Sequence, residues 1–165
     1  MISFGIDPGS HRTGWGVIKA EGSSFSCVDA GVLTADSKAP LSERLTQIFN
    51  GLTAALSQHE PDQVFLESVF HHKSAKSALV LGQARGVALL AAGLKSHSVR
   101  EVAPAEVKKA VTGRGRADKL QVQEMVKILL GLPAPLPSDA SDALAIAIAG
   151  ATRTRWTALT AEAST

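Results

Sequence analysis

The order of its apolar segments is the feature that most constrains how this chain folds. Three strand-like stretches come first, separated by the turns PGSHR and EGSS. Beyond them, segments with apolar residues at helical spacing alternate with short strand-like segments. Strands in direct succession favour antiparallel pairing, whereas strands alternating with helices favour parallel pairing. The pattern therefore predicts an α/β protein, with a mixed sheet and helices on its faces.

The predicted strands are residues 2–6, 14–20, 25–33, 63–67 and 98–102. The predicted helices are residues 41–56, 74–95, 104–110, 119–130 and 140–151. A chain of 165 residues has the size of one compact domain. We assign residues 1–152 to that domain and predict that residues 153–165 are a loose C-terminal tail.

The cellular compartment is indicated by cysteine content and by the apolar runs. A single cysteine, Cys27, cannot form an intrachain disulfide, and the N-terminus lacks the basic and apolar regions of a signal peptide. The longest apolar run, VALLAAGL at residues 87–94, is far shorter than the ~20 residues of a membrane-spanning helix. We therefore expect a cytoplasmic protein without membrane insertion.

Four carboxylates stand where packing does not require them. In FGIDPGS and VFLES, an apolar strand ends on Asp7 and on Glu67. In SDASDALAIAIAG, Asp139 and Asp142 are three residues apart at a helix start, so they share a helix face. Taken singly, each has an ordinary explanation: a turn residue, a solvating group at a strand end, or helix capping. Taken together, they predict one acidic cluster.

An acidic cluster without matching cations is self-repelling, so it is usually maintained because divalent cations neutralise it. Oxygen ligands select hard ions, which here means Mg²⁺ or Mn²⁺. Zinc is disfavoured, because the chain has one cysteine and His71 and His72 are adjacent. Two such ions about 3.5–4 Å apart form the site used for displacement at phosphodiesters.

The basic residues are concentrated although the net charge is only +2. Residues 108–127 contain six Lys or Arg against two acids. Within this segment TGRGRADK indicates a flexible glycine loop that carries Arg114 and Arg116. The segment is either a solvated charged loop or a surface for a polyanion such as DNA.

Four blocks of the sequence together resemble the RuvC-type Holliday-junction resolvases of bacteria. The blocks are FGIDPGSHRTGWGVI, VFLESVFHHKSAKSALVLGQARGVAL, APAEVKKAVTGRGRADKLQVQ and SDASDALAIAIA, in that order over about residues 1–150. The resemblance implies a ribonuclease H-like fold with a five-stranded mixed sheet. It also implies a homodimer that cuts four-way DNA junctions by symmetric paired nicks, together with the RuvA–RuvB branch-migration complex.

By this resemblance Asp7, Glu67, Asp139 and Asp142 are the catalytic and metal-binding residues, with two Mg²⁺ or Mn²⁺ ions. The resemblance also implies DNA contacts, with Phe70 against unpaired bases, and the helix at residues 74–95 is the candidate dimer interface. The predicted DNA-binding residues are Phe70, Lys73, Lys108, Arg114, Arg116 and Lys119. Without the resemblance, a core role for Phe70 and a solvated helix face for the two lysines, Lys108 and Lys119, remain open.

This chain departs from the family pattern beside the second acid. Ser68 stands where a Gln is expected after Glu67, and His71 and His72 replace less polar residues. Neither departure affects a predicted metal ligand, so both bear on local DNA contact and on sequence preference at the cut. Two alternatives stay open: an actin-like or sugar-kinase-like ATPase, and a junction-binding protein without catalysis. Four retained acids argue against the second, since they would weaken binding to DNA.

Overall fold

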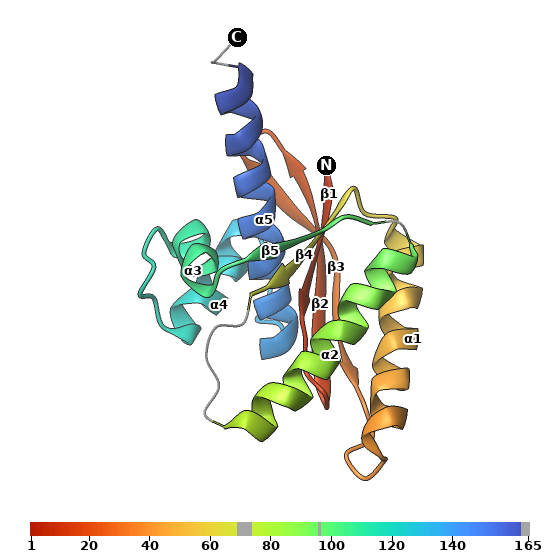
Figure 1. Cartoon of the computed structure of the whole chain (residues 1–165). Helices are drawn as coiled ribbons and strands as arrows, with labels where there is room; N and C mark the ends of the chain where they lie inside the picture. The colour runs from red at the N-terminus through yellow and green to blue at the C-terminus, as the bar shows by residue number, and fades with distance from the viewer. Residues whose placement is uncertain (69–73, 96, 163–165) are drawn as a thin grey trace.

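The strands of this protein form one mixed sheet in a computed structural model, which describes residues 1–68, 74–95 and 97–162. Over these residues the sheet has five strands in the order β3-β2-β1-β4-β5 (Figure 1). The strands are β1 (Ile2–Asp7), β2 (Arg12–Glu21), β3 (Ser24–Thr34), β4 (Gln63–Glu67) and β5 (Val99–Val102). The first three pair antiparallel, whereas β4 runs parallel to β1 and to β5. The predicted mixed sheet is confirmed.

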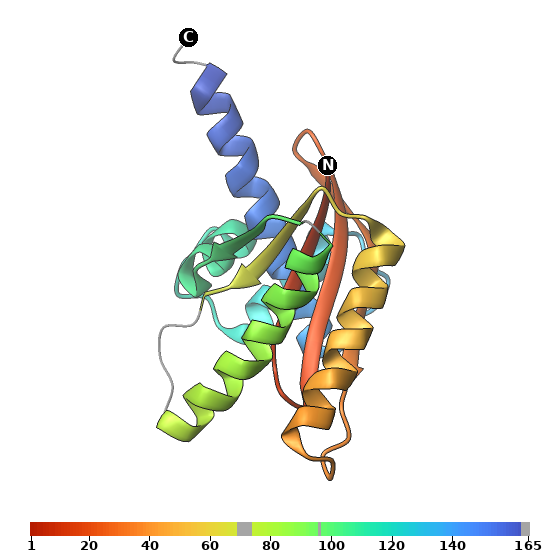
Figure 2. The same cartoon turned by 45° about the vertical axis from the view of Figure 1, so that its right-hand side comes forward.

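Helices cover both faces of the sheet (Figure 2). The helices are α1 (Leu41–His59), α2 (Ala75–Leu94), α3 (Pro104–Thr112), α4 (Lys119–Leu129) and α5 (Ser138–Glu162). On one face, α1 and α2 enclose an apolar cluster that includes Phe4, Ile6 and Leu66. On the other face, α5 packs on the sheet and is flanked by α3 and α4, around a cluster that includes Phe65 and Leu144.

Local signals explain where the helices around the later site begin and end. Pro104 opens α3, where its missing N–H costs no hydrogen bond, and Gly113 ends α3 at a φ of 74°. Asp118 begins α4 with a capping box, in which its side chain accepts from the backbone N–H of Gln121. The segment between Gly113 and Asp118 is therefore a short loop held at both ends.

The end of α5 differs from the sequence prediction. The predicted end at Ala151 is wrong, because α5 continues as a helix to Glu162 and its last turns project beyond the sheet (Figure 1). No Gly or Pro interrupts this segment after Gly150, and several threonine hydroxyls, including those of Thr152 and Thr157, donate to carbonyls one turn earlier. These hydroxyl groups are thus bonded within the helix. The division into a domain at residues 1–152 and a tail stays a prediction.

Helix α2 agrees with the predicted helix at residues 74–95 to within one residue at each end, but its apolar character extends beyond the run VALLAAGL. An 18-residue window of this 20-residue helix has a mean hydropathy of 1.5, so by length and composition alone α2 could cross a membrane. The exclusion drawn from VALLAAGL considered too short a segment, because Gly and polar residues that interrupt the run still lie within one helix. In the structure α2 packs against α1 and beside β5, and 22% of the apolar window is buried.

Candidate active site

Two of the predicted acids lie side by side at the ends of neighbouring strands. β1 and β4 are parallel with Ile6 opposite Leu66, so Asp7 and Glu67 are adjacent at the next position. Ile6 and Leu66 face the α1–α2 core, and alternation along a strand therefore directs Asp7 and Glu67 toward α5. The Asp-Pro-Gly sequence ends β1 there, because Pro8 and Gly9 turn the chain away from the sheet.

The other two acids come from the start of α5, which lies directly on the strands. Glycines on β1 and β2 permit this approach. A Cβ on Gly5 would lie 2.0 Å from the carbonyl oxygen of Ala143, and one on Gly14 would lie 1.9 Å from that of Asp139. Side chains at these positions would push α5 away from the sheet. The glycines thus bring Asp139 and Asp142 to the strand ends that carry the first two acids.

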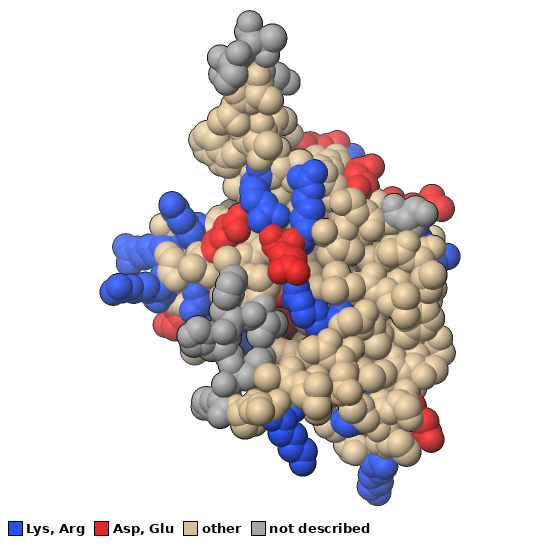
Figure 3. Space-filling model, viewed as in Figure 1, with Lys and Arg blue, Asp and Glu red and all other residues tan. Residues whose placement is uncertain are grey.

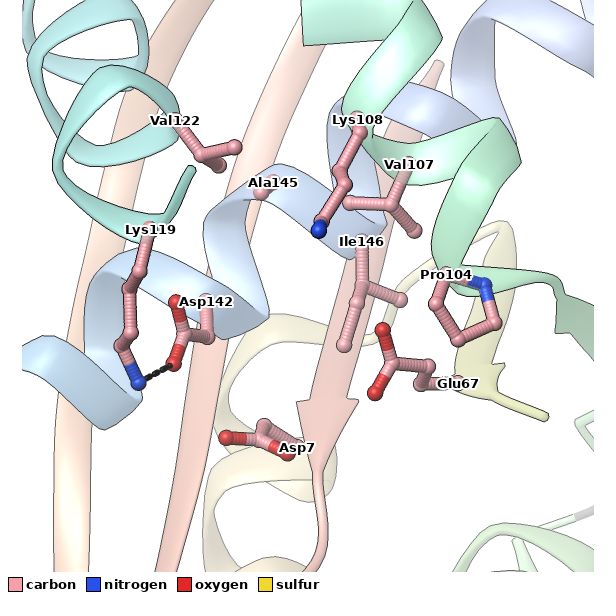
Figure 4. A pocket seen from close by; sticks show the side chains of 10 residues that line it. All are labelled: Asp7, Glu67, Pro104, Val107, Lys108, Lys119, Val122, Asp142, Ala145 and Ile146. Carbon is pink, nitrogen blue, oxygen red and sulfur yellow. Dashed lines mark ion pairs between the residues drawn. The ribbon is translucent and has the colours of Figure 1, made fainter. Parts of the chain in front are cut away.

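A cavity of about 270 Å³ lies where the strand ends meet α5 (Figure 4). Asp7, Glu67 and Asp142 line it, together with apolar side chains from α3, α4 and α5. Figure 4 shows the side chains of Lys108 and Lys119 entering the same space from α3 and α4. Three carboxylates and two ammonium groups therefore share one partly enclosed pocket.

Burial and mutual repulsion shift the acids' pKa values upward. Burial raises the pKa of Asp7 to about 7 from its ordinary 3.8, and the charges of Asp142, Glu67 and Asp139 add to this in that order. Burial also raises the pKa of Glu67, followed by the charge of Asp142. A group of acids with raised pKa values in a pocket is typical of a site that binds cations or transfers protons.

Two basic side chains of the protein form ion pairs with the acids of α5. The Nε of Arg12 donates to Oδ2 of Asp139 at 2.7 Å, and the Nζ of Lys119 is 2.7 Å from Oδ2 of Asp142. The hydrogen bond to Asp142 raises the pKa of Lys119. Two of the four acids are thus neutralised by basic side chains in this arrangement.

Two arginines at this site were not predicted from the sequence. Arg12 follows the PGSH turn directly and could have been suspected from that position. Arg85 lies in the apolar helix α2, where it donates to the backbone carbonyl of Glu67 and forms an ion pair with Glu101. A single charge in the middle of such an apolar helix was the available signal.

The donors fit a hard divalent cation, although they do not converge on one point. Over the described ranges, no three Asp, Glu, His or Cys side chains lie close enough together to hold a metal ion. Burial and, after it, the charges of three neighbouring acids raise the pKa of Asp7, and a bound cation would favour the ionised carboxylate against both. Oxygen-only donors are the set that Mg²⁺ and Mn²⁺ accept.

Of the remaining predicted residues, the structure describes only the two arginines of the basic loop. Arg114 and Arg116 are exposed on the loop between α3 and α4, where Lys and Arg side chains gather on the surface (Figure 3). Phe70, His71, His72 and Lys73 lie outside the described residues. The unexpected Ser68 is buried, and its backbone N–H donates to the carbonyl of Val102 at 2.8 Å. Ser68 therefore fixes the end of β4 against β5.

The model of one protein family, described as crossover junction endodeoxyribonuclease RuvC, matches residues 3–150. This chain belongs to the RuvC family. A RuvC named crossover junction endodeoxyribonuclease, from Citrifermentans bemidjiense, is 49% identical over 144 residues, which are 87% of this chain and 88% of that protein. The ATPase alternative is set aside by this membership.

RuvC structures have the same fold as this chain. The T. thermophilus RuvC in complex with Holliday junction substrate matches with a TM-score of 0.90 and 33% identity, over 95% of this chain and 96% of that chain. The yeast mitochondrial Holliday junction resolvase Ydc2 matches with a TM-score of 0.62 and 12% identity, over 89% and 77%, which shows a shared fold alone. The predicted ribonuclease H-like fold is confirmed, and RuvC nucleases are in general dependent on divalent metal.

Proposed function

We propose that this protein is a metal-dependent endonuclease that resolves four-way DNA junctions by paired, symmetric nicks, in recombination and repair. The observation that carries this proposal is that Asp7, Glu67 and Asp142 line one pocket, with Asp139 bound to Arg12 beside it, in a chain that belongs to the RuvC family. The related T. thermophilus protein forms a complex with Holliday junction substrate.

We assign Asp7, Glu67, Asp139 and Asp142 as the ligands of two Mg²⁺ or Mn²⁺ ions. When bound there, such ions supply an activated water and neutralise the leaving oxygen of the cut phosphodiester. The protein's own part is to hold the acids on rigid strand and helix ends. Lys108 and Lys119 line the same pocket, so their ammonium groups are placed to offset negative charge that develops on the phosphate.

The proposed DNA surface extends from this pocket to the basic loop. Lys108, Arg114, Arg116 and Lys119 lie on or between α3 and α4, and Figure 3 shows basic side chains gathered over this part of the molecule. Phe70 and Lys73 come three and six residues after the end of β4 in the sequence and complete the set of proposed DNA contacts. Phe70 would stack on an unpaired base. Basic groups around an acidic pocket would hold the polyanion while the acids hold metal.

We propose that two copies pair through α2. Leu79, Leu90 and Leu94 are at least half exposed and fall on one stripe of this helix. Figure 3 shows a broad, largely uncharged surface in this part of the molecule. A two-fold dimer presents two identical pockets to a two-fold substrate, which is what paired symmetric nicks require. We further expect cooperation with the RuvA–RuvB complex, in the cytoplasm of a bacterium.

The decisive experiment compares a synthetic four-way junction with a linear duplex of the same sequence, in Mg²⁺, in Mn²⁺ and in EDTA. We expect paired nicks in the junction only, abolished by EDTA and by Asp7→Asn, with junction binding by that variant largely kept. The control Asp36→Asn makes the same chemical change at an exposed loop position and should cut normally. Tight binding without cuts in either metal would instead favour the junction-binding protein without catalysis.

A further inference from the structure

Asp139 differs from the other three acids in that it is paired with Arg12 and does not line the cavity. Asp7, Glu67 and Asp142 line the cavity, whereas Asp139 is bound to Arg12 at 2.7 Å and is not part of the cavity wall. The Asp139 side chain is 27% exposed and the Arg12 side chain 51%. The pair therefore lies at the edge of the pocket, in contact with solvent.

The backbone of Asp139 is packed tightly against the sheet, so rotation of its side chain is the way for its carboxylate to approach the other three acids. Its carbonyl oxygen lies 1.9 Å from where Gly14 would carry a Cβ, so this turn of α5 rests directly on β2. Arg12 is two residues before Gly14 on the same strand. Of the three acids whose charges raise the pKa of Asp7, Asp139 has the smallest effect, which agrees with a carboxylate turned away from it.

We propose that Arg12 is a positioning residue that holds Asp139 out of the metal pocket and competes with divalent cation for this carboxylate. The inference rests on the proposed function, since it takes Asp139 as a metal ligand. The guanidinium balances one of four acids whose mutual repulsion would otherwise be larger. Two cations facing one carboxylate repel each other, so binding of a divalent ion near Asp139 weakens its contact with Arg12.

The ion pair is suited to being displaced. Both partners are on the solvent side, where an ion pair is weak because water and salt screen it. Arg12 thus lowers metal affinity by a small factor without closing the site. The Lys119–Asp142 pair has a similar geometry, but Lys119 is already assigned a role toward the phosphate and is not used for this test.

The experiment measures Mn²⁺ binding by the full chain without DNA, by electron paramagnetic resonance of the free ion. The salt concentration is ~0.15 M, at which exposed charges more than ~8 Å apart are largely screened from each other. For Arg12→Ala we expect Mn²⁺ affinity about two- to fivefold higher than wild type, the range set by an exposed ion pair. Arg12→Lys keeps the charge and should stay near wild type. Arg155→Ala removes an equal charge 13 residues beyond Asp142 on α5 and should change nothing.

A second arm tests whether the gain passes through Asp139. Asp139→Asn placed in the Arg12→Ala background should remove the tighter binding, and thermal unfolding should show that every variant folds. Affinity of Arg12→Ala equal to or below wild type would overturn the competition and leave the nuclease proposal intact. If junction nicking fails while Arg12→Ala still binds Mn²⁺ more tightly, the proposed function falls instead. Lack of Mn²⁺ binding in wild type and all variants would overturn both.

Discussion

At Asp7, burial and the neighbouring negative charges both disfavour the ionised carboxylate. It ends a buried strand, shares its pocket with Glu67 and Asp142, and has its pKa raised to about 7 from 3.8. Without a bound cation the fold therefore favours the protonated acid, although the proposed chemistry needs the ionised one. Site function and stability of the free protein are in conflict at this side chain.

This conflict predicts how stability depends on pH. Between pH ~4 and ~7 the folded protein keeps a proton on Asp7 that the unfolded chain releases, so stability is lost as pH rises through this window. Asp7→Asn cannot ionise, and in EDTA at pH 8 it should be more stable than wild type, by on the order of a few kcal/mol. At pH 4 the difference should largely vanish.

Urea unfolding at a series of pH values in EDTA measures this. The control Asp36→Asn should follow the wild-type curve at every pH. A constant offset between Asp7→Asn and wild type from pH 4 to 8 would show that the folded protein does not raise the pKa of Asp7.

At the scale of elements, the contact between the start of α5 and the strands β1 and β2 assembles the site. Gly5 and Gly14 are the positions where the helix backbone comes nearest to the sheet. A site built in this way depends on residues that have no functional group. Their substitution should damage both the fold and the pocket.

Gly5→Ala should destabilise the protein by at least about 2 kcal/mol, because its Cβ would lie 2.0 Å from the backbone oxygen of Ala143. The nearest atoms all belong to the helix backbone, which cannot move aside as a flexible side chain can. Chemical unfolding measures the loss, and junction nicking should fall with it. Gly115→Ala is the control, since its nearest atom would be 3.6 Å away in an exposed loop. Equal stability of the two variants would show that α5 does not rest on β1 as described.

The loop between α3 and α4 is the second element with a testable role. Arg114→Ala combined with Arg116→Ala should weaken junction binding in EDTA. It should also reduce the slope of log affinity against log salt by about one to two, since each phosphate contact contributes about 0.9. The control pairs Lys38→Ala with Arg155→Ala, which removes two exposed charges elsewhere. An unchanged slope would remove the loop from the DNA path.

At the scale of the whole molecule, the exposed stripe on α2 is the feature that a single chain leaves unexplained. Leu79, Leu90 and Leu94 are 65%, 54% and 66% exposed, and the helix around them is apolar enough to resemble a membrane span. Apolar surface of this kind usually marks an interface. Pairing of two copies would bury it and set the spacing of the two pockets.

Leu90→Asp should convert a dimer into a monomer, because it places a charge within the buried stripe at a cost of several kcal/mol. Sedimentation velocity measures the oligomeric state, and junction cleavage should lose its paired, symmetric character. Ile128→Asp changes an equally exposed apolar residue on α4 and should leave the state of the protein unchanged. A dimer that survives Leu90→Asp places the interface elsewhere.

Features that depend on residues close together in the chain could be predicted before the structure was known. Alternation along β4 directs Phe65 and Glu67 to one face, Pro104 starts α3, and the three-residue spacing puts Asp139 and Asp142 on one side of α5. The order of strands and helices likewise predicted a mixed sheet. Local rules were insufficient at the end of α5, where the sequence predicted a helix end at Ala151 but the helix continues to Glu162.

Only the tertiary structure decided which distant residues meet. Arg12 and Asp139 are 127 positions apart, and they pair because β2 and α5 are pressed together through Gly14, a contact that no local pattern encodes. The same contact decides that Asp139 stands outside the cavity that Asp7, Glu67 and Asp142 line. Side-chain periodicity gives the direction of a residue from its own element, whereas the position of one element on another follows from packing of the whole core.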